Sequence, residues 1–293
     1  MADNTVKIDR YLISKLFPQR TADSNKGTYG TVLNIAGSIY YPGAAYLSSI
    51  SALKSGCGLV RLATESSVIP ITAANSPDIT FLDLGQNEIG TIPKDAFKIL
   101  KNIKSPSCIS IGCGLSTLAP VREFVIKFLK NYIDSTIPVI IDADAINILS
   151  SENNKPLPLN SAVTPHPKEL SRLLGVSVEE IQSDRIKWAK EASGKLDCIV
   201  VLKGLNTIVS IPNGNVFVNT TGNSALSHGG TGDVLCGMIA GFAAQGIKLE
   251  DACVLGVYLH GRAGELASKK LTKYSTLASD VVKFIPEAFK EFV

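Results

Sequence analysis

Several features that would place this chain in a broad class are scarce or missing. The most apolar stretch, residues 234–244, is far shorter than the ~20 residues that a membrane-spanning helix needs. The six cysteines include no Cys-x-x-Cys pair, so the usual spacing of a structural zinc site is absent. Lysine and arginine total 29 against 26 acidic residues and form no basic run. We therefore expect a protein that binds neither membrane nor nucleic acid.

An apolar core of a signal peptide is also missing, because residues 1–10 carry four charged side chains. Most cysteines lie in apolar segments, where a free cysteine behaves as a small hydrophobe. That usage suits a reducing compartment, although the sequence leaves a disulfide open. We expect a cytoplasmic protein.

What recurs along the chain is a short run rich in valine and isoleucine, then a turn and a helical stretch. Such runs are typical of strands buried on both faces of a parallel sheet. They are Val32–Ala36, Leu59–Ala63, Ile79–Leu82, Cys108–Ile111, Pro138–Ile141, Ser161–Thr164 and Cys198–Leu202. The helical candidates are Ala44–Lys54, Lys94–Lys104, Pro120–Tyr132, Lys168–Leu174, Val178–Ala192, Thr231–Ala244 and Glu250–Lys269. Alternating strands and helices predict a three-layer α/β/α sandwich around a mostly parallel sheet.

Two later strands, Thr207–Ile211 and Val216–Asn219, flank a turn at residues 212–215 and predict a hairpin at one sheet edge. No linker rich in proline, glycine or serine divides the chain. We expect one domain over residues 1–293, with residues 1–25 as an N-terminal lead-in. Ligands of such sheets bind beyond the carboxyl ends of the strands.

The strongest chemical signal is the loop Gly229-Gly230-Thr231-Gly232-Asp233, which opens an apolar helix. Three glycines in four residues let the backbone turn its N–H groups inward, and these donors with the helix dipole bind anions such as phosphate. Asp233 would take a proton from a substrate hydroxyl beside the bound phosphates. The alternative is a plain helix N-cap, but a cap does not require three glycines.

This loop resembles the Ala-Thr-Gly-Gly-Thr-Gly-Asp signature of the NAD(P)H-hydrate dehydratases, a branch of the ribokinase-like superfamily. Further segments match that family in the same order. They are Lys26–Gly30, Pro42–Ala45, Ser55–Val60, Ile111–Leu115, Ile141–Asn147, Thr164–Glu169 and Val201–Gly204. The resemblance extends from residue 26 to about residue 285, and the segment Thr164-Pro-His-Pro-Lys-Glu169 is its most specific part.

The resemblance implies a ribokinase-like fold and repair of the hydrates NADHX and NADPHX. In this family the hydroxyl of the hydrate is phosphorylated and phosphate is then expelled, which restores NADH or NADPH. Asp233 would be the catalytic base and a contact to the hydrate, together with Ala44, Gly114 and His166. For Ala44 tight helix packing is an equal alternative, for Gly114 a plain turn, and for His166 a packed or capping residue.

The resemblance also implies a site for an adenine nucleotide, with ADP as the expected phosphoryl donor and ATP as the other choice. Its lining would consist of Lys203, Gly204, Leu205, Asn206, Thr207, Gly229, Gly230, Thr231 and Gly232. Taken alone, the segment 203–207 would read as a hairpin turn with an exposed lysine.

Oxygen-bearing side chains follow the strand at Pro138–Ile141 and could hold Mg²⁺, directly or through water. Asn147 and Glu169 are the expected contacts, with helix capping and first-turn charge as their alternatives. For Asp142 we expect helix capping rather than metal binding, and Asp144 could cap in the same way.

Three positions depart from the family pattern, which usually has proline at Cys113, threonine at His228 and Asn-Pro at Asn223-Ser224. None of them removes a group with an implied role. The alternatives to a dehydratase are a ribokinase-like kinase for a vitamin precursor or sugar-like alcohol, and a nucleotide-sensing module without turnover. We also expect a homo-oligomer, on the resemblance alone.

Overall fold

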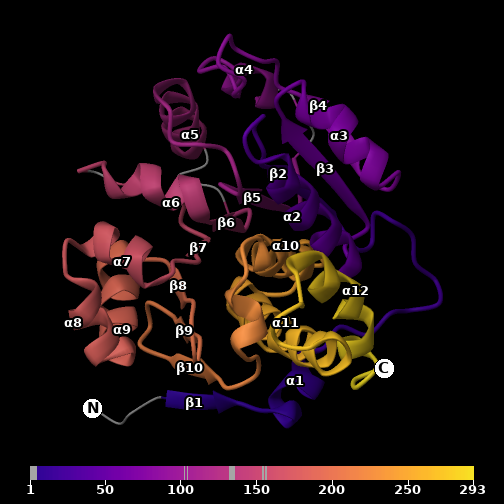
Figure 1. The fold of residues 1–293 in the computed structure, drawn as a ribbon, viewed down its shortest axis with the longest axis vertical. Helices are drawn as coiled ribbons and strands as arrows, with labels where there is room; N and C mark the ends of the chain where they lie inside the picture. The colour runs from indigo at the N-terminus through magenta and orange to yellow at the C-terminus, as the bar shows by residue number, and fades with distance from the viewer. Residues whose placement is uncertain (1–4, 102, 104, 132–135, 154, 156) are drawn as a thin grey trace.

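The computed structural model describes residues 5–293 except 102, 104, 132–135, 154 and 156. Within that part of the chain, ten strands form one sheet in the order β1-β10-β9-β8-β7-β6-β5-β2-β3-β4 (Figure 1). The strands are β1 (Thr5–Ile8), β2 (Thr31–Ile35), β3 (Leu59–Thr64), β4 (Thr80–Asp83), β5 (Cys108–Ile111), β6 (Val139–Ile141), β7 (Ser161–Val163), β8 (Ile199–Leu202), β9 (Ile208–Ser210) and β10 (Val216–Asn219). Neighbouring strands run parallel except at β8–β9 and β9–β10.

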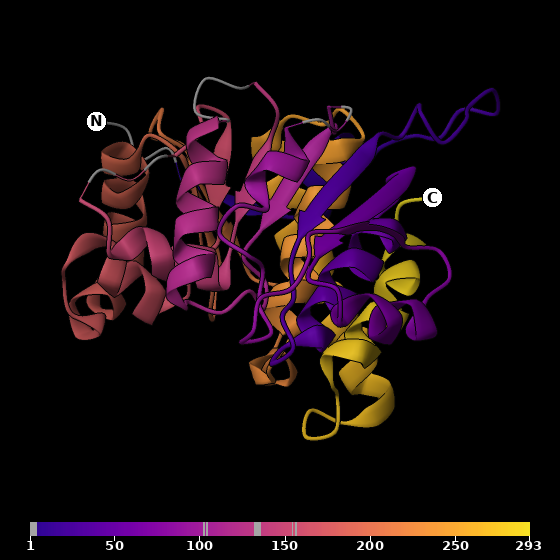
Figure 2. The same ribbon diagram turned by 90° about the horizontal axis from the view of Figure 1, so that it is seen from above.

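Helices cover both faces of the sheet (Figures 1 and 2). One face carries α1 (Arg10–Leu16), α2 (Pro42–Lys54), α3 (Val68–Asn75), α10 (Thr231–Ala244), α11 (Leu249–Leu271) and α12 (Ala278–Phe289). The other carries α4 (Phe97–Leu100), α5 (Ala119–Asn131), α6 (Ala143–Ser150), α7 (Pro167–Leu174), α8 (Val178–Ser183) and α9 (Arg185–Leu196). Each face has its own hydrophobic core. The predicted three-layer α/β/α fold is therefore confirmed.

The central strands are the most deeply buried, and their ends set the position of the site. Every residue of β5, β6, β7 and β8 is buried, as the apolar runs predict. Ile111, Ile141, Val163 and Val200 stand side by side across these four strands. Residues just beyond them therefore meet at one edge of the sheet, which is where parallel sheets place ligands.

Helix α10 anchors the glycine loop that precedes it. All its residues from Val234 to Ala244 are buried, and burying each large aliphatic side chain contributes about 1.5–3 kcal/mol. Its observed bounds are the predicted ones. The first turn of α10 is thus held rigidly at the carboxyl edge of the sheet.

Two predictions of individual elements were wrong. The region 178–192 forms two helices, because Asp184 ends α8 and its side chain caps α9 by accepting from the Lys187 N–H at 3.0 Å. The helix predicted at 94–104 is confined to Phe97–Leu100 among the described residues. The lead-in contains β1, which pairs with β10 at the sheet edge, and α1.

None of the described helices combines the length and apolarity needed to cross a membrane.

Candidate functional site

A buried group of charged side chains lies at the carboxyl ends of the central strands. Lys203, directly after β8, donates from Nζ to Asp142 Oδ1 at 2.7 Å, and Nζ lies 3.9 Å from Glu169 Oε2. The Lys203 side chain is 18% exposed, and those of Asp142 and Glu169 are 1% and 6% exposed. The alternative of an exposed turn lysine is therefore wrong. The three segments meet because β6, β7 and β8 are adjacent in the sheet.

Asp233, in the first turn of α10, faces the same group. Burial raises the pKa of Asp233 to about 6, and the Asp142 carboxylate adds to that rise. The Cys113 thiol and the Lys203 ammonium act in the opposite direction and favour the ionised carboxylate. A carboxyl group with a pKa slightly below neutrality is mostly ionised at pH 7 and can still accept a proton readily, which suits a general base.

Lys203 and Glu169 are perturbed by the same surroundings. Burial works against the Lys203 charge, but the Asp142 and Glu169 carboxylates outweigh it and raise the lysine pKa. Burial raises the pKa of Glu169 to about 7, although Lys203 opposes that rise. Perturbed groups gathered at a strand edge are typical of functional sites.

The loop before α10 has the backbone that the glycines predict. Gly230 occupies the N-cap position with φ +90°, and a Cβ there would lie 2.7 Å from Leu47 Cδ1. Thr231 Oγ1 donates to the carbonyl oxygens of Leu226 at 2.8 Å and His228 at 3.0 Å, which holds the turn in place. The first N–H groups of a helix lack helical acceptors. Backbone donors of this kind stand at the start of α10, next to Asp233, and helix N-termini of this kind attract anions.

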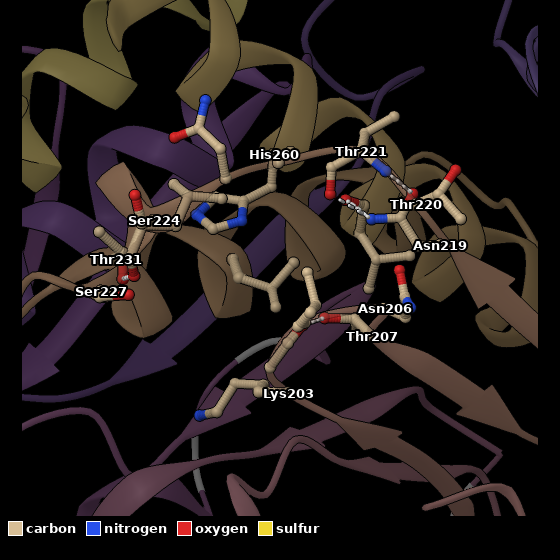
Figure 3. Close-up of a pocket in the computed structure, with 18 of the residues that line it drawn as sticks. Lys203, Asn206, Thr207, Asn219, Thr220, Thr221, Ser224, Ser227, Thr231 and His260 are labelled. Carbon is tan, nitrogen blue, oxygen red and sulfur yellow. Dashed lines mark hydrogen bonds between the residues drawn. The ribbon is translucent and has the colours of Figure 1, made fainter. Parts of the chain in front are cut away.

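A cavity of about 390 Å³ opens beside this loop (Figure 3). Thr231 and Ser227 lie on one side of it, and Asn206, Thr207 and Asn219 lie on the other. Among the residues predicted to bind nucleotide, those that line it are Lys203, Gly204, Leu205, Asn206, Thr207, Thr231 and Gly232. Gly229 and Gly230 belong to the adjoining turn and are not part of its lining.

Sequence reasoning missed one wall of this cavity. That wall consists of residues 219–224, with Val257, His260 and Gly261 of α11 behind it. The only signal was the polar run that begins at Asn219, the last residue of the last strand, and continues to Ser224. The His260 and Gly261 contributions come from the interior of an apolar helix, where the pattern predicts only core residues.

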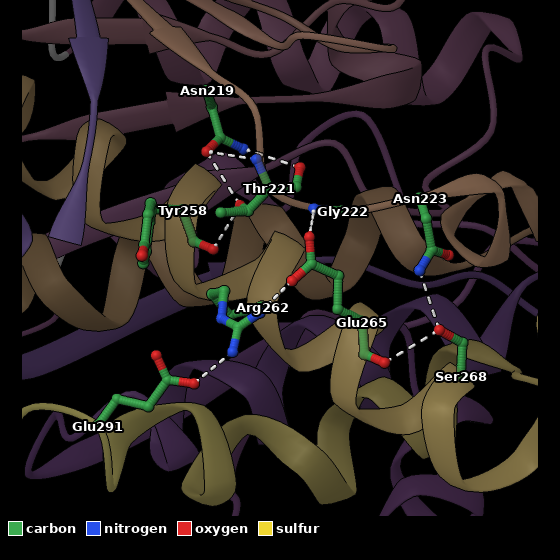
Figure 4. Close-up of polar contacts among 9 residues, drawn as sticks. All are labelled: Asn219, Thr221, Gly222, Asn223, Tyr258, Arg262, Glu265, Ser268 and Glu291. Atoms are coloured by element: carbon green, nitrogen blue, oxygen red, sulfur yellow. Dashed lines mark hydrogen bonds and ion pairs between the residues drawn. The ribbon is translucent and has the colours of Figure 1, made fainter.

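Side-chain hydrogen bonds tie this wall to α11 (Figure 4). The Gly222 N–H donates to Glu265 Oε1 at 2.8 Å, and Arg262 bridges Glu265 and Glu291. Asn223 Nδ2 donates to Ser268 Oγ at 3.0 Å. Further bonds run from Asn219 Nδ2 to the Val257 carbonyl at 3.0 Å and from Thr221 Oγ1 to the Tyr258 carbonyl at 2.9 Å. The wall therefore starts at the end of β10 with Asn219, and its residues beyond the strand are held by the helix layer.

His166 caps α7. Its Nδ1 accepts from the N–H groups of Lys168 at 3.1 Å and Glu169 at 3.2 Å, while Glu169 Oε2 accepts from the His166 N–H at 2.7 Å. Burial, with Lys203 nearby, lowers the pKa of His166 and favours the neutral ring. Because Nδ1 accepts, the proton of the neutral ring sits on Nε2. His166 therefore acts as a helix cap, which is one of its two alternatives. Its ring is half-exposed, and its Nε2–H remains a hydrogen-bond donor.

Ala44 and Gly114 lie against each other. Gly114 has φ +65°, and a Cβ there would lie 2.7 Å from Ala44 Cβ and 2.8 Å from Tyr41 Cβ. Close packing between α2 and the loop after β5 therefore accounts for the small size of both residues. Both remain partly exposed, at the same edge of the sheet as Asp142.

The expected capping role of Asp142 was wrong. Asp142 stands at the N-cap position of α6, but its side chain makes no capping hydrogen bond, because Lys203 binds it instead. Asp144 accepts from the Ser116 N–H at 2.8 Å. Asn147 Oδ1 accepts from Arg172 Nη1 at 2.7 Å. Oxygen atoms are thus abundant around α6, but each of these side chains already has a protein partner.

Comparison with known proteins identifies relatives over almost the whole chain. The NAD(P)H-hydrate dehydratase family profile matches residues 32–287. The ADP-dependent (S)-NAD(P)H-hydrate dehydratase of Bacillus subtilis is 35% identical over 276 residues, covering 94% of each chain. A crystal structure of the B. subtilis ADP/ATP-dependent NAD(P)H-hydrate dehydratase, co-crystallized with ATP/Mg²⁺, superposes with a TM-score of 0.86 at 34% identity and covers both chains fully.

Other relatives are longer than this chain. A bifunctional NAD(P)H-hydrate repair enzyme of Moorella thermoacetica is 36% identical over 276 residues, which cover 92% of this chain and 51% of that protein. The chain thus spans about half the length of such bifunctional relatives.

A hydroxyethylthiazole kinase from Pyrococcus horikoshii, at 14% identity and a TM-score of 0.59, shares the fold alone.

Proposed function

The chain belongs to the NAD(P)H-hydrate dehydratase family, and we propose that it converts the S-form of NADHX or NADPHX back to NADH or NADPH at the expense of ADP. The observation that carries the proposal is the position of Asp233. This partly buried carboxylate lies on the first turn of α10, beside the first backbone N–H groups of the helix and next to Thr231 and Gly232, which line a cavity of about 390 Å³.

The nucleotide would occupy the cavity between residues 203–207 and residues 219–224. Its base and ribose would meet Leu205, Leu226 and Val257 together with asparagine and threonine side chains, a mixture typical of small-molecule pockets. The phosphates would point to the N–H groups of α10, where Gly232 leaves the backbone open beside Lys203. ADP is the proposed donor, as the name of the B. subtilis relative indicates.

Asp233 would act as the base. As the hydroxyl of the hydrate attacks the terminal phosphoryl group of ADP, its proton passes to the carboxylate and AMP leaves. The phosphate then departs from the ring with a proton from the neighbouring carbon, which restores the double bond. The α10 N–H groups would stabilise the charge on the transferred phosphoryl group, since they are oriented before reaction begins.

The hydrate would lie at the loop after β5, where Ala44 and Gly114 form one side. His166 would donate from Nε2–H to a polar group of the hydrate, since its Nδ1 is committed to the α7 cap. This assignment joins residues from α2, the β5 loop and the start of α7 at a single edge of the sheet.

The donors around α6 fit Mg²⁺ held through water and nucleotide phosphates. Asn147, Asp144 and Glu169 are oxygen donors of the kind this cation prefers, but each has a protein partner that leaves little room for direct coordination. The chemistry that Mg²⁺ supplies when bound is neutralisation of phosphate charge. Asn147 and Glu169 would orient its water shell.

A homo-oligomer and a cytoplasmic location stay predictions. Sedimentation of the purified chain tests the first, and fractionation of the source cells tests the second.

The function is tested by incubating the protein with hydrated NADH plus ADP, ATP or no nucleotide and following recovery of the reduced nicotinamide absorbance. We expect recovery with nucleotide, and its loss in Asp233→Asn while calorimetry still detects ADP binding. A stable phosphorylated alcohol without recovery would favour the small-molecule kinase instead. Unchanged turnover in Asp233→Asn would remove Asp233 from the role of base, and binding without any turnover would favour a sensing module.

A further inference from the structure

Two cysteines with no part in the proposed reaction lie within the site. Cys113 follows β5, Cys236 lies in α10 one turn after Asp233, and Asp142 follows β6. The two sulfur atoms and one Asp142 carboxylate oxygen all lie within 4.8 Å of one another. All three side chains are at most 1% exposed. Three separate elements thus bring two thiols and a carboxylate to one point.

We propose that Cys113, Cys236 and Asp142 bind a thiophilic divalent cation such as Zn²⁺, and that this binding inhibits the enzyme by capturing Asp233. The binding step stands on the geometry of the cluster alone. The inhibition rests on the proposed role of Asp233 as the base.

The distances are close to those of a tetrahedral zinc site. Zinc lies about 2.3 Å from thiolate sulfur and about 2.0–2.2 Å from carboxylate oxygen, which places sulfur and oxygen about 3.5 Å apart and two sulfurs about 3.8 Å apart. Cys113 Sγ lies 3.9 Å from Asp142 Oδ2. Given the 4.8 Å limit, the two sulfur atoms would have to approach each other by about 1 Å at most, and Cys236 Sγ and the Asp142 oxygen by about 1.3 Å at most, to reach ideal values.

Lys203 does not compete for the same oxygen. Its Nζ binds Asp142 Oδ1 at 2.7 Å, whereas Oδ2 is the atom that faces Cys113. Asp142 can therefore hold the lysine and the cation together. On binding, each thiol releases its proton and the resulting thiolate coordinates the metal, so two protons leave for each Zn²⁺ bound.

The donor set discriminates between metals. Mg²⁺ requires near-octahedral oxygen coordination, which two thiols cannot supply. Soft sulfur donors select Zn²⁺ and similar ions. The cluster is therefore distinct from the oxygen-rich surroundings of Asn147 and Glu169.

Asp233 would become the fourth ligand. It lies one turn before Cys236 on α10, so the two side chains lie on the same face of the helix. Its carboxylate would turn to the metal once the cation is bound. A base held by a metal cannot take the proton of the hydrate.

The binding experiment uses the purified protein without nucleotide. Zn²⁺ is titrated by calorimetry, and Co²⁺ is added to observe the thiolate-to-metal charge-transfer absorption in the ultraviolet. We expect one tight site per chain, and a loss of affinity of at least about 100-fold in Cys113→Ala and in Cys236→Ala, because removal of a ligand should exceed the loss of a supporting partner. Cys198→Ala, a buried cysteine outside the cluster, is the matched control and should bind as the parent does.

Absence of the charge-transfer band in the parent protein would overturn the site, and this result does not depend on how any variant folds. Equal binding in Cys236→Ala and Cys198→Ala would overturn it as well. A Cys236→Ser variant with unchanged thermal unfolding repeats the comparison.

Inhibition is measured in the recovery assay. Zn²⁺ should suppress turnover in the parent and in Cys198→Ala, and EDTA should restore that turnover. Cys236→Ala should keep its turnover at Zn²⁺ concentrations that inhibit the parent. Tight binding without inhibition would overturn the capture of Asp233. If the parent protein shows no turnover without Zn²⁺, the proposed function fails, whereas the binding result is unaffected.

Discussion

Replacement of Lys203 by methionine tests the electrostatics of the site most directly. The ammonium contacts the nearly inaccessible Asp142 at 2.7 Å and lies close to Glu169. Methionine has a similar volume but leaves both carboxylates without their cation. Removal of one partner of a buried ion pair costs about 3–5 kcal/mol, because the remaining charge is buried without compensation. We expect Lys203→Met to lower the free energy of unfolding by about that amount.

The same change should alter the pH profile. Lys203 favours the ionised form of Asp233, whose pKa is about 6. Without the ammonium this pKa rises, so a larger fraction of the base is protonated near neutral pH. The acid limb of log kcat/KM should therefore move to higher pH, and the loss of activity should diminish as the pH is raised.

Urea denaturation gives the first quantity and the recovery assay across pH gives the second. The control is Lys290→Met, which removes an exposed pair with Glu287 and should change stability by less than about 0.5 kcal/mol. The double variant Lys203→Met with Asp142→Leu should regain part of the lost stability, since the Asp142 charge is removed and only Glu169 is left without its cation. A Lys203→Met protein as stable as the parent, with an unmoved acid limb, would refute the reasoning.

Three further predictions concern neighbouring groups. Burial raises the pKa of Glu169 from 4.5 to about 7, so between these values the folded protein keeps a proton that the unfolded chain has lost, and the stability of the parent falls as pH rises through this interval. Glu169→Gln should therefore gain stability relative to the parent from about pH 4.5 to about pH 7 in urea titrations, and a pH-independent difference would contradict this. Arg262→Met should weaken ADP binding about fivefold by calorimetry through loss of the wall support, equivalent to about 1 kcal/mol, with the KM for hydrate unchanged; unaltered ADP affinity would mean that the wall holds without it. Gly114→Ala should destabilise the protein by about 1–3 kcal/mol because of its positive φ and its contact with Ala44, and a neutral result in thermal unfolding would show that the loop moves freely.

The sequence predicts the sheet centre and α10 well because their apolar patterns have one structural solution. It predicts the edges poorly. Strand β1 has only Ile8 buried and carries charged Lys7, so nothing in its pattern separates it from a loop. The break at Asp184 interrupts a pattern that reads as one continuous helix.

The residues of the candidate site likewise divide into those that the sequence predicts and those that it does not. The segment 203–207 and the glycine loop are local motifs, and their convergence follows from the order of parallel strands. The side-chain partners are not local: Lys203 and Asp142 are 61 residues apart, and the choice between capping and ion pairing at Asp142 depends on that distant lysine. The cavity wall at residues 219–224 depends on α11, which the sequence alone does not orient.

The bridge formed by Arg262 has a mechanical consequence for the C-terminal segment. Glu291 touches no part of the cavity, yet it shares Arg262 with Glu265, which holds the wall at Gly222. A ligand that stiffens the wall should therefore slow the opening of the chain end as well. Amide exchange after α12 would then report on occupancy of a cavity that lies on the far side of α11.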